Sequence, residues 1–159
     1  FIQKRPGKNG VPFSLIKFRT MKNIFREDRD LEKDNFRQTR LGNFLRKTSL
    51  DELPELINIL KGDMSFIGPR PLLIEYLKLY NKRHKKRHNV KPGISGLAQI
   101  NGRNSIDWKT RLDYDIYYVE NFSIWLDMKI FIKTFNVLLN QEGINHKDNF
   151  SMPPFKGLD

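Results

Sequence analysis

The sequence predicts an α+β fold: a mainly helical single domain over residues 1–159, with a small N-terminal β-hairpin and interfacial amphipathic helices. Three observations predict it. Two β-prone runs near the amino terminus flank a segment rich in turn residues. Several later segments repeat apolar residues at helical spacing. A length of 159 residues suits one domain, and neither an internal repeat nor a second domain is apparent.

The first elements are short. Residues 1–3 and 13–19 are the β-prone runs, and Arg5-Pro-Gly-Lys-Asn-Gly10 between them predicts the turn of a hairpin. Residues 23–47 are dominated by charge, with acids and bases interleaved, which predicts a solvated helix or a mobile loop.

Helices follow. One begins at residue 51 and is closed by Gly62, and four of its apolar residues fall on one face: Leu53, Leu56, Ile57 and Leu60. A second helix is predicted over residues 72–86. Residues 90–104 predict loops with one short strand at 97–100. Helices over 108–120 and 124–140 complete the domain, and residues 141–159 predict an irregular tail.

The composition restricts the partners. The formal net charge of +11 predicts an anionic partner: nucleic acid, an acidic membrane surface or a phosphorylated ligand. The chain has no cysteine, which excludes disulfides and thiolate metal sites. No helix-turn-helix, zinc-finger or RNP-like pattern is present, so we expect no nucleic-acid partner. No Walker A loop or G-x-G-x-x-G motif indicates a common nucleotide-binding fold.

The adjacent acids Asp51 and Glu52 have two interpretations. Ser49 and Glu52 have the spacing of a capping box, and Asp51 is itself a suitable N-cap, so helix capping explains both acids. Alternatively, an ionised carboxylate at a helix start can attack phosphorus, and its neighbour can hold Mg²⁺ or accept a proton. Arg46 before the pair and Arg70 in a Pro-Arg-Pro segment after it suit a diphosphate.

Two further acids lie on apolar helix faces. Asp115 falls within the arc of Trp108, Leu112, Ile116 and Val119, and Asp127 lies opposite the polar stripe of its helix. A buried carboxylate is costly unless it is paired, so each is expected to meet an arginine, a lysine or backbone donors. Each forms either a structural ion pair or a support for active-site arginines such as Arg70 or Arg103.

Residues 78–88 contain no acid and are rich in lysine and arginine. This pattern describes either a solvated helix end or an interfacial helix on anionic lipid. His84 and His88 have metal-like spacing, but no third ligand is nearby, so we interpret them as surface residues.

A series of motifs follows one order along nearly the whole chain: Lys17-Phe-Arg-Thr-Met21, Asp51-Glu-Leu-Pro-Glu-Leu56, Gly62-Asp-Met-Ser65, Gly68-Pro-Arg-Pro71, Lys91-Pro-Gly-Ile-Ser-Gly96, Asn101-Gly-Arg103, Asp115-x-x-Tyr-Val119 and Leu126-Asp-x-Lys-Ile130. In these motifs the chain resembles the bacterial sugar transferases known as monotopic phosphoglycosyl transferases. It looks most like the small enzymes that initiate bacterial protein N-glycosylation.

The resemblance implies transfer of a sugar 1-phosphate from a UDP-sugar to a polyprenol phosphate, with release of UMP. It implies Asp51 as the nucleophile of a covalent phosphosugar intermediate, Glu52 as the second acid of the pair, and Mg²⁺ held by these two acids. The substrate contacts that it implies are Arg46, Arg70, Asn101 and Arg103.

The resemblance also implies a location at the cytoplasmic face of the bacterial inner membrane, with an N-terminal hydrophobic helix that enters and leaves on the same side. This sequence begins beyond that point, so we expect a fragment that can be soluble. The alternative function is a non-catalytic basic module that binds anionic membrane or nucleic acid.

Overall fold

The computed structural model describes residues 1–22, 39–102, 105–140 and 153–158. The predicted hairpin is present: β1 (Ile2–Pro6) pairs antiparallel with β2 (Pro12–Ile16), and a short 3-10 helix, η1 (Lys8–Gly10), joins them. Phe13 and Leu15 are buried on one face of β2 and pack with Met64. Because side chains alternate along a strand, the next residue on that inner face is Lys17.

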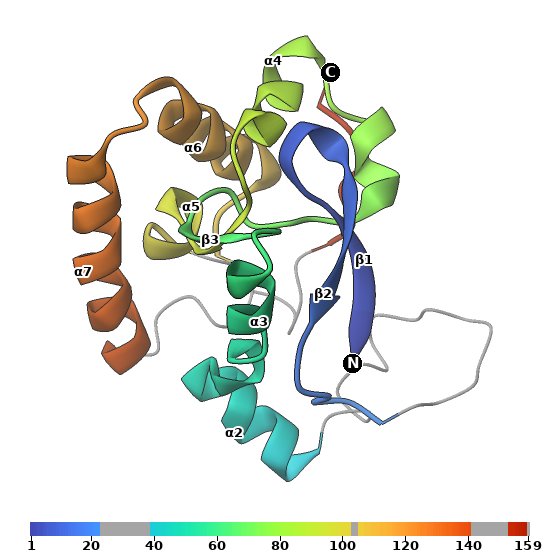
Figure 1. The fold of residues 1–159 in the computed structure, drawn as a ribbon, viewed down its shortest axis with the longest axis vertical. Coiled ribbons are helices and arrows are strands. Elements are labelled where there is room, and N and C mark those ends of the chain that lie inside the picture. Colours follow the sequence, from blue (N-terminus) through green and yellow to red (C-terminus); the bar gives the residue numbers. More distant parts are fainter. Residues whose placement is uncertain (23–38, 103–104, 141–152, 159) are drawn as a thin grey trace.

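A second sheet lies at the centre of the fold (Figure 1). It consists of β3 (Ser65–Ile67) and β4 (Gly93–Ser95), which pair in parallel. The backbones approach so closely here that a Cβ on Gly93 would lie 2.2 Å from the amide nitrogen of Gly68. The strand predicted at 97–100 is wrong: these residues form the helical turn α5 (Leu97–Ile100), because pairing with β3 uses the extended residues before Gly96 instead.

The acidic pair lies between two helices. α2 (Arg40–Thr48) ends where Ser49 adopts a left-handed conformation with φ 57°. The 3-10 turn η3 (Leu50–Glu52) follows and carries both acids, and α3 (Glu55–Leu60) starts after Pro54. The Ser49 side chain does not cap η3, so the capping box is not formed. Gly62, with φ 83°, follows the end of α3 as predicted.

α3 buries a polar face. Glu55 and Asn58 are buried, whereas the four predicted apolar residues share a face that is largely exposed. The Asn58 side chain continues the hydrogen bonding of the β2 edge. Its amide nitrogen donates to the Ser14 carbonyl at 2.8 Å, and its oxygen accepts from the Ile16 backbone at 3.1 Å. The helix is therefore attached to the hairpin by polar contacts.

The helix predicted over residues 72–86 is replaced by three short elements: η4 (Ile74–Lys78), α4 (Lys82–Lys85) and η5 (Lys86–Asn89). Asn81 interrupts the run because its side chain caps α4 by accepting from the His84 backbone. Tyr76 and Tyr80 nevertheless point inward, into a core with Phe155 of the tail, which is irregular over 153–158.

The prediction that His84 and His88 are surface residues is wrong, since they are only 5% and 8% exposed. The short elements fold back on the domain, and the His88 ring lies 5.7 Å from that of Tyr80. Burial and the adjacent Arg87 charge lower the pKa of His88 to about 4, so it is neutral near pH 7.

The last two helices match the prediction: α6 (Trp108–Glu120) and α7 (Ile124–Asn140). α7 packs on α5, β3 and β4 through Ile130, while Trp125, Phe131 and Phe135 remain exposed on it. Within the described residues, no helix combines the length and the apolar character needed to cross a membrane. The small antiparallel sheet and the predominance of helix confirm the predicted α+β class.

Candidate active site

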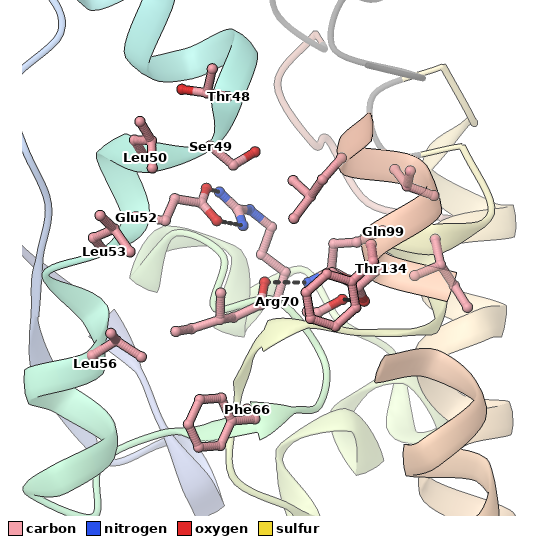
Figure 2. A pocket seen from close by; sticks show the side chains of 16 residues that line it. Thr48, Ser49, Leu50, Glu52, Leu53, Leu56, Phe66, Arg70, Gln99 and Thr134 are labelled. Atoms are coloured by element: carbon pink, nitrogen blue, oxygen red, sulfur yellow. Dashed lines mark hydrogen bonds and ion pairs between the residues drawn. The ribbon is translucent and has the colours of Figure 1, made fainter. Parts of the chain in front are cut away.

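Four charged side chains from four different elements form one ion-pair cluster. Lys17, directly after β2, places its Nζ 3.0 Å from Glu52 Oε1 and 2.8 Å from Glu55 Oε1. Arg70, after β3, also pairs with Glu52 Oε1 (Figure 2). The hairpin end, η3 and the Pro-Arg-Pro segment thus meet at Glu52, and α3 joins them through the pair of Glu55 with Lys17.

Glu52 is fully engaged. Arg70 donates from Nη2 to Oε1 at 2.5 Å and from Nη1 to Oε2 at 3.3 Å, and Lys17 also donates to Oε1. Burial disfavours the ionised form of Glu52, but Arg70 and Lys17 outweigh burial and hold its pKa well below the usual range. Glu52 is therefore a fixed carboxylate that orients two cations.

Asp51 differs from its neighbour. Its backbone carbonyl accepts from the Phe18 amide at 2.9 Å, which ties η3 to the end of the hairpin. Among the described residues, no side chain forms a hydrogen bond or an ion pair with the Asp51 carboxylate. Burial and the charge of Glu52 raise the pKa of Asp51, against the opposing charges of Lys17, Arg70 and Arg46. This carboxylate is thus available for a ligand or a reaction.

The same geometry tests the expected Mg²⁺ site. Glu52 accepts hydrogen bonds from cationic donors at both oxygens, so it is poorly suited to a metal ion, whereas no side chain in the described ranges is bonded to the Asp51 carboxylate. In the described part of the chain, no three His, Cys, Asp or Glu residues gather as a metal site. Mg²⁺ commonly takes only one or two protein carboxylates and completes its shell with substrate phosphates and water. With a diphosphate present, Asp51 would be the residue to hold Mg²⁺, and the ion would neutralise phosphate charge.

Arg70 is held in place through its backbone. Arg87 donates from Nη2 to the Arg70 carbonyl at 2.8 Å, and it pairs with Asp115 Oδ2 through Nη2 at 2.7 Å and Nε at 3.0 Å. The side chains of Arg87 and Asp115 are each only 2% exposed. Asp115 therefore meets an arginine, as predicted, and its link to Arg70 runs through Arg87.

Asp127 has a different partner from those predicted. It accepts a hydrogen bond from the Tyr118 hydroxyl at 2.8 Å rather than from an arginine, a lysine or the backbone. α6 and α7 are joined by a short corner, and this brings Tyr118 against the first turn of α7. The bond ties α6 to α7, and no described contact of Asp127 reaches Arg70.

The other predicted substrate contacts are less clustered. Arg46, in the last turn of α2, donates to the Thr20 hydroxyl at 3.1 Å and contributes to the field at Asp51. The Asn101 side chain donates to the Leu97 carbonyl at 2.8 Å and so caps α5. This hydrogen bond does not involve Asp51 or Glu52. Arg103 lies outside the described residues.

Sequence reasoning did not single out Lys17, Glu55 or Arg87 as site residues. Two signals were available. Lys17 follows Phe13 and Leu15 at period two, which places a lysine on the inner face of a strand. Glu55 and Asn58 share a helical face that a purely apolar interpretation of α3 ignores. Arg87 gave no signal, because it lies within a run of basic residues.

Two openings of different character border Arg70. A cleft of about 360 Å³ between α3 and α7 is walled mainly by apolar side chains, and Glu52 and Arg70 are among the residues that line it (Figure 2). A recess of about 210 Å³ on the hairpin side is lined by Arg5, Lys17, Glu55, Arg70, Tyr76 and Trp108. Arg70 is thus accessible both from an apolar cleft and from a cationic recess.

A family model described as bacterial sugar transferase matches residues 1–141. The chain belongs to the bacterial sugar transferase family. This membership confirms the family that the ordered motifs predicted, and with it the enzyme class. The family model covers the hairpin, the acidic turn, the Pro-Arg-Pro segment and both long helices.

Relatives of this family are similar over nearly the whole chain. An uncharacterized sugar transferase, EpsL of Bacillus subtilis, is 48% identical over 157 residues, covering 99% of this chain and 78% of that protein. A UDP-glucose:undecaprenyl-phosphate glucose-1-phosphate transferase of Klebsiella pneumoniae is 43% identical over 152 residues, covering 89% and 33%. An undecaprenyl-phosphate galactose phosphotransferase of Salmonella typhimurium is 40% identical over 157 residues, covering 88% and 33%. The chain therefore spans about a third of these last two sugar transferases.

Proposed function

We propose that this chain transfers a sugar 1-phosphate from a UDP-sugar to a polyprenol phosphate and releases UMP. The observation that carries the proposal is an Asp51 carboxylate with no ion-pair partner among the described side chains, beside a Glu52 that is fixed by Arg70 and Lys17. The names of the Klebsiella and Salmonella relatives, which are sugar phosphate transferases acting on undecaprenyl phosphate, support the same reaction class.

The proposed chemistry has two displacements at one phosphorus atom. An Asp51 oxygen attacks the β-phosphorus, the bond to the bridging oxygen breaks, and UMP leaves with the electron pair. An oxygen of the lipid phosphate then attacks the same phosphorus, and the bond to Asp51 breaks. The products are a polyprenyl diphosphosugar and a free carboxylate. Neither step needs a proton to be transferred.

The surrounding charges support this role. An anionic nucleophile and an anionic diphosphate repel each other, and cations held near the developing charge offset that repulsion. Arg70 and Lys17 are already oriented by Glu52, so binding substrate requires little rearrangement of either side chain. Mg²⁺, where bound by Asp51 and the diphosphate, would supply further neutralisation of phosphate charge.

We also propose that the chain works at an anionic membrane surface, at the cytoplasmic face of the inner membrane. α7 carries exposed Ile124, Trp125 and Phe131 along with Lys129 and Lys133, and lysines beside exposed aromatic residues suit an interfacial helix. The alternative of a non-catalytic basic module is less favoured, because similar proteins are named as transferases that act on undecaprenyl phosphate.

The proposal is tested by UMP release. The chain, incubated with a panel of UDP-sugars, polyprenol phosphate in mixed micelles and Mg²⁺, is expected to release UMP from at least one UDP-sugar and to transfer sugar phosphate to the lipid. Sustained UMP release, beyond one equivalent per chain, that matches the amount of lipid consumed supports the reaction. Salt-sensitive binding of nucleic acid without any UMP release would favour the non-catalytic module.

Removing the metal is expected to lower the rate. EDTA in excess of Mg²⁺ is expected to reduce UMP release at least about tenfold, because the β-phosphate charge then opposes attack by Asp51. Titration of Mn²⁺ into the apo chain gives a readout besides activity, since paramagnetic broadening of the Asp51 region reports binding directly. A rate that is unchanged by EDTA would contradict the metal requirement.

A further inference from the structure

The apolar cleft between α3 and α7 lies directly beside the charged side chains of the candidate active site. Apolar side chains line it from both helices and from β3 and β4, including Leu53, Leu56, Phe66, Phe135 and Leu138. Figure 2 shows Leu53 and Leu56 on one wall, Thr134 on the opposite wall, and Arg70 rising between them toward Glu52. The cleft therefore contains two members of the ion-pair cluster, Glu52 and Arg70.

The cleft walls are exposed without having a partner in the described chain. Leu56 is 39% exposed and Phe135 is 53% exposed, although both face the same hollow. This exposure follows from the polar attachment of α3, since Glu55 and Asn58 occupy its buried face and turn the leucines outward. Contiguous exposed apolar side chains beside polar ones mark a binding surface.

We propose that this cleft holds the isoprenoid chain of the phosphorylated acceptor, with the acceptor phosphate at Arg70. The inference rests on the proposed function and names the place of one of its substrates. The cleft offers apolar walls and a guanidinium that lies between them, and a prenyl phosphate has the complementary pattern of a long apolar chain with one anionic group.

The other substrate fits the cleft less well. A UDP-sugar carries hydroxyl groups, a diphosphate and a polar base along its length, and apolar walls would leave these groups unpaired. The recess on the other side of Arg70 is lined by Arg5 and Lys17 as well as two aromatic rings, which suits an anionic nucleotide better. Arg70 borders both openings, so the two substrates approach the cluster from different sides.

The test compares cleft residues with matched residues on the same two helices. Leu56→Gln and Phe135→Gln place an amide in the cleft, and neither side chain is buried, so both variants are expected to fold. Leu60→Gln on α3 and Leu139→Gln on α7 are the controls, since these leucines are 87% and 80% exposed and do not line the cleft. All four variants remove one apolar residue from the same surface.

The first readout is binding, which does not depend on turnover. A soluble short-chain isoprenyl phosphate, titrated into each protein by calorimetry, is expected to bind at least about tenfold more weakly to both cleft variants and within about twofold of wild type to both controls. A tenfold rise in KM for polyprenol phosphate is expected in the same two variants. An equal loss in all four variants, or no loss in any, would overturn the cleft assignment.

The outcomes separate the two proposals. Cleft-dependent binding without UMP release would retain the acceptor site and reject the proposed reaction. UMP release with unchanged acceptor KM in both cleft variants would retain the reaction and reject the acceptor site. A dimer in sedimentation that dissociates on Leu56→Gln would assign the cleft to a second copy of the chain, which also overturns the proposal.

Discussion

Asp51→Asn is expected to reduce UMP release at least about a thousandfold, because an amide oxygen cannot displace UMP and form the acyl phosphate. The substitution keeps the size of the side chain. It leaves the Glu52 ion pairs with Arg70 and Lys17 in place, so the fold is expected to be unaffected. Single-turnover measurement of UMP, made without the lipid, isolates the first displacement.

Intact-protein mass spectrometry checks the covalent step separately. Wild-type protein incubated with its UDP-sugar is expected to gain the mass of one sugar phosphate, and Asp51→Asn is expected to gain none. Asp113→Asn is the matched control, because this aspartate forms an ion pair with Arg83 at the surface, and such pairs contribute little. An adduct on the Asp51→Asn protein, or full turnover by it, would rule out Asp51 as the nucleophile.

Arg87→Met and Asp115→Asn are each expected to lower the free energy of unfolding by about 3–5 kcal/mol, because each leaves a buried partner without its counter-charge. For a chain of this size that corresponds to a fall in melting temperature of about 10 °C. The double variant Arg87→Met with Asp115→Asn removes both charges, so its loss is expected to be smaller than the sum of the single losses.

A catalytic readout distinguishes positioning from stability. Arg87→Lys retains the charge next to Asp115 but cannot keep the forked contacts, one of which reaches the Arg70 carbonyl. Its kcat/KM for the UDP-sugar is expected to fall at least about tenfold at a temperature where circular dichroism shows it folded. Wild-type kcat/KM in Arg87→Lys would limit the Arg87–Asp115 pair to a structural role. A melting temperature within 2 °C of wild type in Arg87→Met and Asp115→Asn would contradict the expected contribution of the pair to the free energy of unfolding.

Local patterns predicted the elements that local interactions determine. The hairpin follows from a turn between two β-prone runs, and the bounds of α6 and α7 follow from uninterrupted helical spacing. The segment over residues 72–86 failed because an Asn81 cap competes with helix continuation, and helical periodicity does not report that competition. The strand near residue 97 failed because strand position depends on the partner, here β3.

The site was predictable in its residue types and less so in its contacts. The motifs indicated Asp51, Glu52 and Arg70; the structure pairs Glu52 with Arg70 and leaves Asp51 next to them, where their charges influence its pKa. The buried face of α3 was not predictable from apolar spacing, because tertiary hydrogen bonds from Asn58 override it. Asp127 was correctly suspected of needing a partner, but the geometry of the corner between α6 and α7 decides that Tyr118 supplies it.

The attachment of α3 has a consequence for local unfolding. A helix of six residues is too short to be stable alone. α3 is therefore expected to stay folded only while the Asn58 side chain is hydrogen-bonded to β2 and Glu55 is paired with Lys17. The backbone amide of Phe18 also donates to the Asp51 carbonyl and so attaches η3 to the end of the hairpin. Opening of the hairpin would therefore release the acidic turn in the same event, and the two segments form one cooperative unit. The reactive geometry at Asp51 is thus only as persistent as the pairing of β1 with β2, even though no residue of either strand carries out the proposed chemistry.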